Sequence, residues 1–141
     1  MKRYIDTSVL VAYYLPEALS ARAERVLLSG GQPAISSLVE LEFASVLARK
    51  VRARELAPSA ARAVLDQFRA HREQGLYRRL DIGEADFAQA RRWVEALRLP
   101  LRTLDALHLS VATGAGDTLL TADKQLARAA RALHLPCQLL K

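Results

Sequence analysis

The segment KRYIDTSVLVAYYL (residues 2–15) is a short apolar run that ends in an acid and leads directly into a helical pattern. Residues 2–6 are typical of a buried strand, and residues 9–15 are typical of a helix that Pro16 closes. A strand followed at once by a helix is the repeating unit of α/β folds. The segment therefore predicts the first unit of an α/β domain.

The rest of the chain repeats this alternation, without an internal repeat or a low-complexity linker. Further strands are expected at residues 33–36, 76–82, 118–121 and 136–140. Further helices are expected at residues 19–29, 38–54, 58–73, 84–97, 104–113 (with Thr103 as its N-cap) and 124–133. The pattern predicts one α/β domain over residues 1–141, with a mostly parallel central sheet of four or five short strands flanked by helices.

Four acids interrupt apolar sequence at separate places along the chain, namely Asp6, Glu42, Asp105 and Asp123. Ligands of open α/β sheets bind beyond the carboxyl ends of the strands. Asp6 ends the first strand and Asp123 follows the strand at 118–121, so the two should be close together if their strands are parallel neighbours. Asp105 lies in the first turn of its helix, where the helix dipole favours a carboxylate.

Each of these acids also has a purely structural interpretation. Asp6, Asp105 and Asp123 all lie at or near a helix start, where an Asp commonly serves as a cap or dipole partner. The helix that carries Glu40 and Glu42 is apolar almost all round, so its periodicity leaves open which of the two faces inward. If several of the carboxylates converge, a divalent cation or shared protons must offset their charge.

Other polar residues are interpreted as structural. His108 is expected to be packed or to support a site, because no second His follows at metal-ligand spacing. His71 and His134 are expected at the surface, and Asp117 in a turn. Cys137, the single cysteine, is expected to be a buried packing residue, and it excludes an internal disulfide framework.

The composition is that of an ordinary globular protein with a basic surface. Hydrophobic residues make up 51% of the chain, and 21 Lys and Arg against 15 Asp and Glu give a net charge of +6. This balance favours a polyanionic partner, although a high arginine content can also reflect genome composition. No run approaches the ~20 apolar residues of a membrane span. Signal-peptide features are also missing, so the expected location is the cytoplasm.

The first two acid-containing segments resemble motifs of the PIN-domain ribonucleases, and within that family the VapC-type toxins of prokaryotic toxin–antitoxin pairs. IDTSVLVAYY (residues 5–14) resembles the family's opening motif, with its acid at Asp6. ISSLVELEFASVLARKVR (residues 35–52) resembles the second motif, and this alignment selects Glu42 over Glu40.

The resemblance continues to the end of the chain. LRTLDALHLSVA (residues 101–112) is close to the third motif, with its acid at Asp105. LLTADKQLARAARALHLP (residues 119–136) resembles the last motif, with its acid at Asp123 and a supporting hydroxyl at Thr121. None of the four acidic positions departs from the family pattern.

The resemblance implies a Mg²⁺-dependent endoribonuclease, with Mn²⁺ as a possible substitute, in which Asp6, Glu42, Asp105 and Asp123 are both catalytic and metal-binding. Carboxylates are the hard oxygen ligands that these ions prefer. In our hypothesis Asp6 and Asp105 hold the principal metal, and Glu42 and Asp123 bind a second ion or orient its waters. The resemblance also implies an RNA substrate, a cognate antitoxin and a homodimer.

Three alternatives remain open at this stage. A PIN nuclease of general RNA processing would need no antitoxin, and a module that binds RNA or a protein partner would need no catalysis. A receiver or phosphatase-like domain also places Asp residues at strand ends. However, the first motif of phosphatase-like domains needs a second Asp two residues after the first, where this chain has Ser8.

Overall fold

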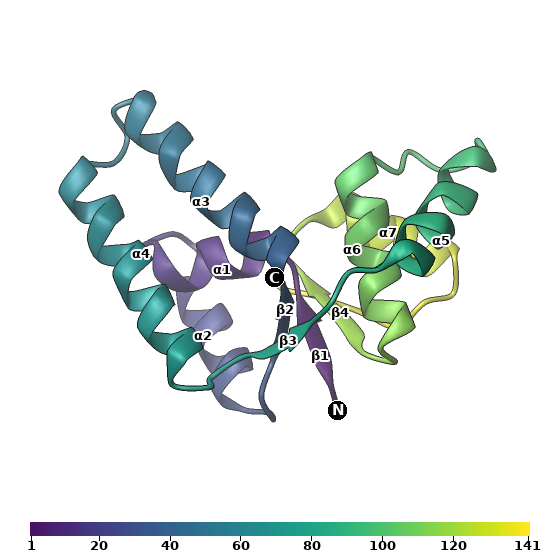
Figure 1. The fold of residues 1–141 in the computed structure, drawn as a ribbon, viewed down its shortest axis with the longest axis horizontal. Coiled ribbons are helices and arrows are strands. Elements are labelled where there is room, and N and C mark those ends of the chain that lie inside the picture. Colours follow the sequence, from purple (N-terminus) through teal and green to yellow (C-terminus); the bar gives the residue numbers. More distant parts are fainter.

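A single five-stranded sheet forms the centre of the molecule (Figure 1). The computed structural model describes all of residues 1–141. The strands are β1 (Arg3–Ile5), β2 (Ala34–Ser36), β3 (Arg78–Leu80), β4 (Thr118–Thr121) and β5 (Cys137–Leu139). Their spatial order is β3-β2-β1-β4-β5, and every neighbouring pair is parallel. The predicted α/β class and parallel sheet are confirmed.

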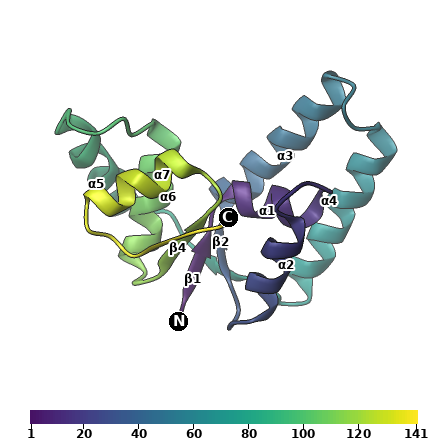
Figure 2. The ribbon, with the colours of Figure 1, turned by 180° about the vertical axis from the view of Figure 1, so that it is seen from behind.

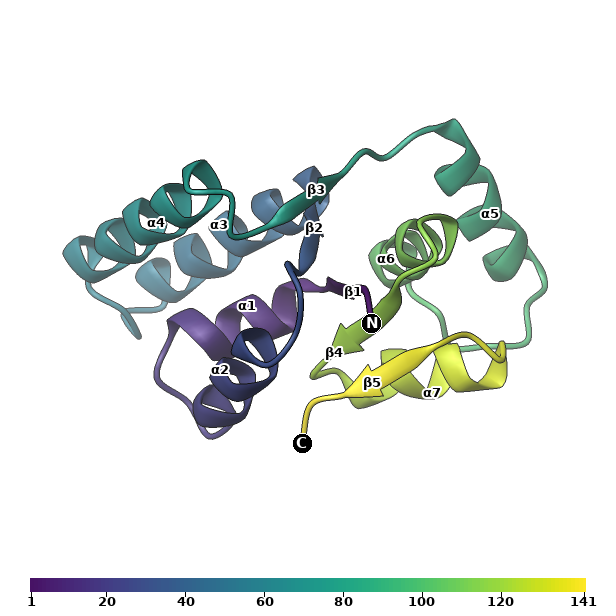
Figure 3. The same cartoon turned by 90° about the horizontal axis from the view of Figure 1, so that it is seen from below.

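Seven helices cover the two faces of this sheet. They are α1 (Thr7–Tyr14), α2 (Ser20–Leu28), α3 (Ser37–Arg52), α4 (Pro58–Glu73), α5 (Glu84–Glu95), α6 (Thr103–Gly114) and α7 (Lys124–Ala132). Helices α1 to α4 lie on one side of the sheet and α5 to α7 on the other (Figure 1; Figure 2). Figure 3 shows the same two groups from below, with α3 and α4 side by side. None of the helices is both long and apolar enough to span a membrane.

The central strands are buried on both faces, as expected for a parallel sheet between helical layers. Tyr4 and Ile5 of β1 pair with Leu119 and Leu120 of β4, and all four are fully buried. Because Ile5 is in register with Leu120, the next residue on each strand reaches the carboxyl edge of the sheet at the same level. The fold therefore places Asp6 beside the end of β4.

Local signals explain where several helices begin and end. Pro58 opens α4 at a position where its missing N–H has no helical partner to lose. Ser36 caps α3 by accepting a hydrogen bond from the Val39 N–H at 3.4 Å. Gly75 ends α4 with a φ of 75°, a left-handed conformation that glycine adopts without steric cost.

Four local predictions need correction. The N-cap of α6 is Arg102 rather than Thr103, which is itself the first helical residue, and no side chain caps this helix. His71 is half-buried instead of at the surface, because its Nδ1 is hydrogen-bonded to the Tyr14 hydroxyl at 2.7 Å. Cys137 is half-buried on an edge strand rather than fully buried. Asp117 does lie in the connection before β4, but its side chain is buried and paired with Arg78 at 2.6 Å.

Candidate active site

Asp6 is held at the carboxyl end of β1 by hydroxyl groups. One of its oxygens accepts a hydrogen bond from Ser8, and the other accepts one from Thr121 at 2.6 Å. Asp6 is only 5% exposed, and burial raises the pKa of its carboxyl, although the two hydroxyls and the nearby His108 act in the opposite direction. Asp6 is the N-cap residue of α1, but its side chain makes no capping hydrogen bond to the helix, so capping alone does not account for this acid.

The same two hydroxyls tie Asp6 to the loop after β4. The Asp123 N–H donates to the Thr121 hydroxyl at 3.0 Å, and the Ala122 N–H donates to the Ser8 hydroxyl at 2.9 Å. Each hydroxyl donates to Asp6 and accepts from the loop, so both of its roles are used. This arrangement fixes the start of α1 against the start of α7.

Glu42 approaches this edge from α3. One of its oxygens, Oε1, accepts a hydrogen bond from Thr7 at 2.8 Å and is also paired with Nε2 of His108. Burial alone would raise the pKa of the Glu42 carboxyl, but the hydrogen bonds from His108 and Thr7 outweigh it, and the pKa lies below its ordinary value. Glu42 is therefore held as a carboxylate beside the residue that follows Asp6.

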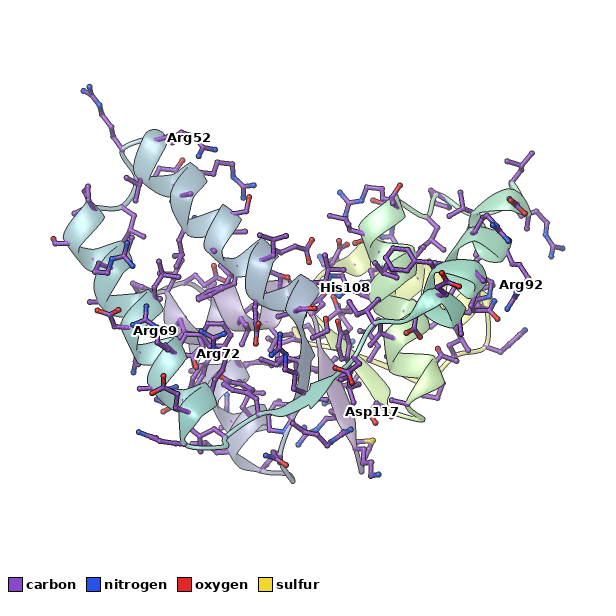
Figure 4. All side chains as sticks on the ribbon, in the orientation of Figure 1. Arg52, Arg69, Arg72, Arg92, His108 and Asp117 are labelled. Atoms are coloured by element: carbon purple, nitrogen blue, oxygen red, sulfur yellow. The ribbon has the colours of Figure 1, made fainter.

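His108 links Glu42 to the core of the sheet. It is 2% exposed and lies on α6, between the two groups of helices (Figure 4). Its Nδ1 is 2.8 Å from the Tyr4 hydroxyl, which is 2.8 Å from the Ser36 hydroxyl. One assignment of the protons satisfies every group, in which Ser36 donates to Tyr4, Tyr4 to Nδ1, and Nε2–H to Glu42. The prediction that His108 is packed is confirmed, and its Nε2 is bound to Glu42.

Asp105 and Asp123 share one cationic side chain. The Arg102 guanidinium donates from Nε to Oδ2 of Asp105 at 2.8 Å and from its terminal nitrogen to Oδ2 of Asp123 at 2.9 Å. The other oxygen of Asp123, Oδ1, caps α7 by accepting from the N–H groups of Gln125 and Leu126. Asp123 therefore caps a helix through one oxygen and binds Arg102 through the other.

Adjacent residues and hydrogen bonds thus connect all four predicted acids. Glu42 is bound to Thr7, the neighbour of Asp6, which is joined through Thr121 to Asp123. Arg102 then joins Asp123 to Asp105. However, no three His, Cys, Asp or Glu side chains come together as a ready-made metal site.

The donor set fits a divalent cation even so. Mg²⁺ usually keeps several waters and takes only one or two protein carboxylates, so three converging ligands are not required. Asp105 and Asp123 already share a positive group, the guanidinium of Arg102, which stands in for a cation between them. The hydroxyl-bound carboxylate of Asp6 adds a further hard oxygen donor.

The side chains of Glu40 and Glu42 point in different directions. Glu40 points away from the other acids, to Arg72 of α4 at 3.2 Å and Arg79 of β3 at 3.3 Å. These residues line a separate surface pocket of about 300 Å³, and Figure 4 labels Arg72 there beside Arg69 on α4. The orientation of Glu42 toward the Asp6 edge is that expected from the resemblance.

Sequence reasoning missed Arg102 and Tyr4. The three-residue spacing of Arg102 and Asp105 near a helix start is a signal for the first contact. Nothing local predicts that Arg102 reaches Asp123, or that Tyr4 reaches His108, 104 residues away in the chain.

Comparison with known proteins gives a family match and several similar folds. Residues 3–132 match the family model described as the PIN domain. No curated protein sequence matches. The solved structure of VapBC2 from Rickettsia felis, bound to a DNA fragment from their promoter, has a TM-score of 0.72 at 18% identity, covering 100% of both chains.

Two other solved structures are similar to the same degree. FitAcB from Neisseria gonorrhoeae has a TM-score of 0.71 at 19% identity, covering 96% of this chain and 95% of that one. VapC20 from Mycobacterium tuberculosis, described as a toxin that cleaves the sarcin–ricin loop, has a TM-score of 0.70 at 21% identity, covering 91% and 95%. At such identities the likeness is one of fold.

Proposed function

Because this chain belongs to the PIN domain family, we propose that it is a metal-dependent endoribonuclease that hydrolyses RNA phosphodiester bonds and acts as the toxin of a type II toxin–antitoxin pair. The observation that carries the proposal is that adjacent residues and hydrogen bonds connect four acidic residues around the carboxyl ends of β1 and β4. This is the edge where open α/β sheets bind ligands. The fold shared with VapC20 and with VapBC2 supports the toxin assignment.

In this proposal Asp6 and Asp105 hold the principal metal, and Glu42 and Asp123 bind a second ion or orient its waters. When bound, Mg²⁺ or Mn²⁺ supplies a water of lowered pKa as the nucleophile and neutralises the charge of the scissile phosphate and leaving oxygen. The chain itself supplies orientation. Ser8 and Thr121 fix Asp6, and the hydrogen bonds of Tyr4, His108 and Thr7 fix Glu42.

The proposed partners follow from the same relationship. We expect a cognate antitoxin that covers the acidic edge, a homodimer, and a cytoplasmic location where RNA and antitoxin meet. Exposed apolar side chains that such contacts could bury include Leu41 on α3 and Leu104 on α6, the helices that carry Glu42 and Asp105, and Phe87 and Val94 on α5.

The direct test compares RNA cleavage by the wild type with Asp6→Asn and Asp105→Asn. Each change removes a negative ligand at nearly constant volume, so we expect cleavage to fall by about 100-fold or more and to stop in the wild type when EDTA is added. Asp66→Asn is the matched control, since Asp66 lies on α4 in an exposed pair with Arg69. Cleavage by Asp6→Asn at the rate of this control would contradict the proposal.

The same variants test whether the loss of RNA cleavage comes from the missing carboxylate or from unfolding. Burial raises the pKa of Asp6, so keeping it ionised at neutral pH costs stability. Asp6→Asn relieves this cost but takes away the acceptor of one hydroxyl, so it should unfold close to the wild-type temperature. A toxin should also arrest growth when expressed and be silenced by the product of a small neighbouring gene. A general RNA-processing nuclease would cleave RNA without this rescue.

A further inference from the structure

Arg102 is the one basic side chain paired with the proposed metal-binding carboxylates of Asp105 and Asp123. It binds both through a forked guanidinium, at 2.8 and 2.9 Å, which is the geometry of strong charge-assisted hydrogen bonds. One positive charge is thereby shared between two negative ones. The arrangement reduces the repulsion between the two carboxylates.

The guanidinium lies on the solvent side of these acids. The Arg102 side chain is 64% exposed, whereas those of Asp105 and Asp123 are 16% and 28% exposed. Because Oδ1 of Asp123 is committed to capping α7, its Oδ2 is the oxygen left to face a cation, and Arg102 occupies it. A cation that approaches these Oδ2 atoms from solvent therefore meets Arg102 first.

No structural requirement explains the contact between Arg102 and Asp123. The start of α7 is already satisfied by Oδ1 of Asp123, and α6 has no side-chain cap that Arg102 would complete. Exposed ion pairs of this kind contribute little to stability. The contact is thus well suited to being exchanged for another cation.

We propose that Arg102 is an internal counterion that competes with divalent cations for Asp105 and Asp123 and moves into solvent when a metal binds. This rests on the proposed function, because it assumes that the carboxylates take up a metal. The apparent metal affinity is then the intrinsic affinity multiplied by the fraction of molecules in which Arg102 has left the two carboxylates. Arg102 thereby raises the metal concentration that is needed to fill the site.

The test is a calorimetric titration of the full-length protein with Mn²⁺ for the wild type, Arg102→Gln and Arg98→Gln. Arg98 is the matched control, since it is exposed, lies four residues away and forms no ion pair, so both variants lose the same charge. We expect Arg102→Gln to bind Mn²⁺ about 3- to 10-fold more tightly than Arg98→Gln, as befits the loss of an exposed competing ion pair. Equal or weaker binding by Arg102→Gln would overturn the inference while leaving the proposed function intact.

A second measurement separates competition from a general electrostatic effect. Without metal, Arg102→Gln should unfold at a slightly lower temperature than Arg98→Gln, because the loss of the ion pair costs little but leaves Asp105 and Asp123 without their shared cation. Saturating Mn²⁺ should remove this difference, since the metal takes the place of the guanidinium. If the difference persists in saturating Mn²⁺, Arg102 is a structural residue and the inference fails. If none of the three proteins binds Mn²⁺, the proposed function fails as well.

Discussion

His108 is placed by the fold so that both of its ring nitrogens are used. Nδ1 faces the Tyr4 hydroxyl in the centre of the sheet, and Nε2 faces Glu42 at the edge. A buried imidazole whose second nitrogen is hydrogen-bonded has a fixed tautomer and orientation. His108 thus holds the Glu42 carboxylate in a fixed position relative to β1. Glu42 lies on α3, which otherwise extends away from the sheet (Figure 1).

The role of His108 is tested by two amides of different length. His108→Asn can keep a bond to Tyr4 but is too short to reach Glu42, whereas His108→Gln can extend an amide toward Glu42. If His108 positions Glu42, we expect cleavage to fall by about 10- to 100-fold in His108→Asn and less in His108→Gln. Both should lose a comparable 1–3 kcal/mol or so of unfolding free energy from the altered buried network. Equal cleavage by the two variants, measured beside urea unfolding, would leave His108 with only a packing role.

At this scale the sequence pointed to four candidate acids but could not predict their contacts. Helical periodicity could not choose between Glu40 and Glu42, because the helix is apolar almost all round. The choice depends on Arg72 and Arg79, which draw Glu40 to the opposite side and come from other elements. Contacts between residues far apart in the chain leave no periodic signal.

The elements themselves were predicted to within a few residues, because apolar runs, Pro58 and Gly75 mark their limits locally. The largest difference falls on the edge strand β3, which is two residues shorter at each end than the expected segment 76–82. An edge strand pairs on one side only, so its length depends on its neighbour and not on its own composition.

Helix α7 offers a way to separate the structural role of Asp123 from its chemical role. Oδ1 caps the helix, whereas Oδ2 binds Arg102 and is the oxygen left for the proposed metal. Asn is also a good N-cap, and Ala is not. We expect Asp123→Asn to keep most of the unfolding free energy and Asp123→Ala to lose about 1 kcal/mol. Both should lose RNA cleavage, and urea unfolding beside a cleavage assay would check this. Wild-type cleavage in Asp123→Asn would confine Asp123 to capping.

Across the whole molecule, tyrosine hydroxyls join elements that are distant in the chain. Tyr14 of α1 lies 2.6 Å from the Tyr77 hydroxyl, just before β3, and 2.7 Å from His71 of α4. Tyr4 performs the same task between β1, β2 and α6. All three tyrosines are buried enough that ionisation is disfavoured, so burial raises their pKa values, that of Tyr77 to about 12. The folded state therefore depends on neutral tyrosines.

This dependence predicts loss of stability in alkaline solution. The unfolded chain releases its tyrosine protons near pH 10, whereas the folded chain holds the proton of Tyr77 to about pH 12. A group with a raised folded-state pKa contributes its full stability below the unfolded value and loses it as the pH rises toward the folded value. Each such tyrosine should lower the unfolding free energy by up to about 1.4 kcal/mol per pH unit above pH 10.

Urea unfolding at pH 8 to 11 would measure this slope, and phenolate absorbance would show which state carries the charge. The unfolding free energy of Tyr77→Phe should fall less steeply with pH than that of the wild type, because the variant lacks one of the three tyrosines. It should also be less stable at pH 8, since it leaves the Tyr14 hydroxyl with one partner fewer. The two curves should therefore converge as the pH rises. Parallel curves would mean that Tyr77 ionises at the same pH in the folded and unfolded chains, and that the tyrosine network does not limit the alkaline stability of the molecule.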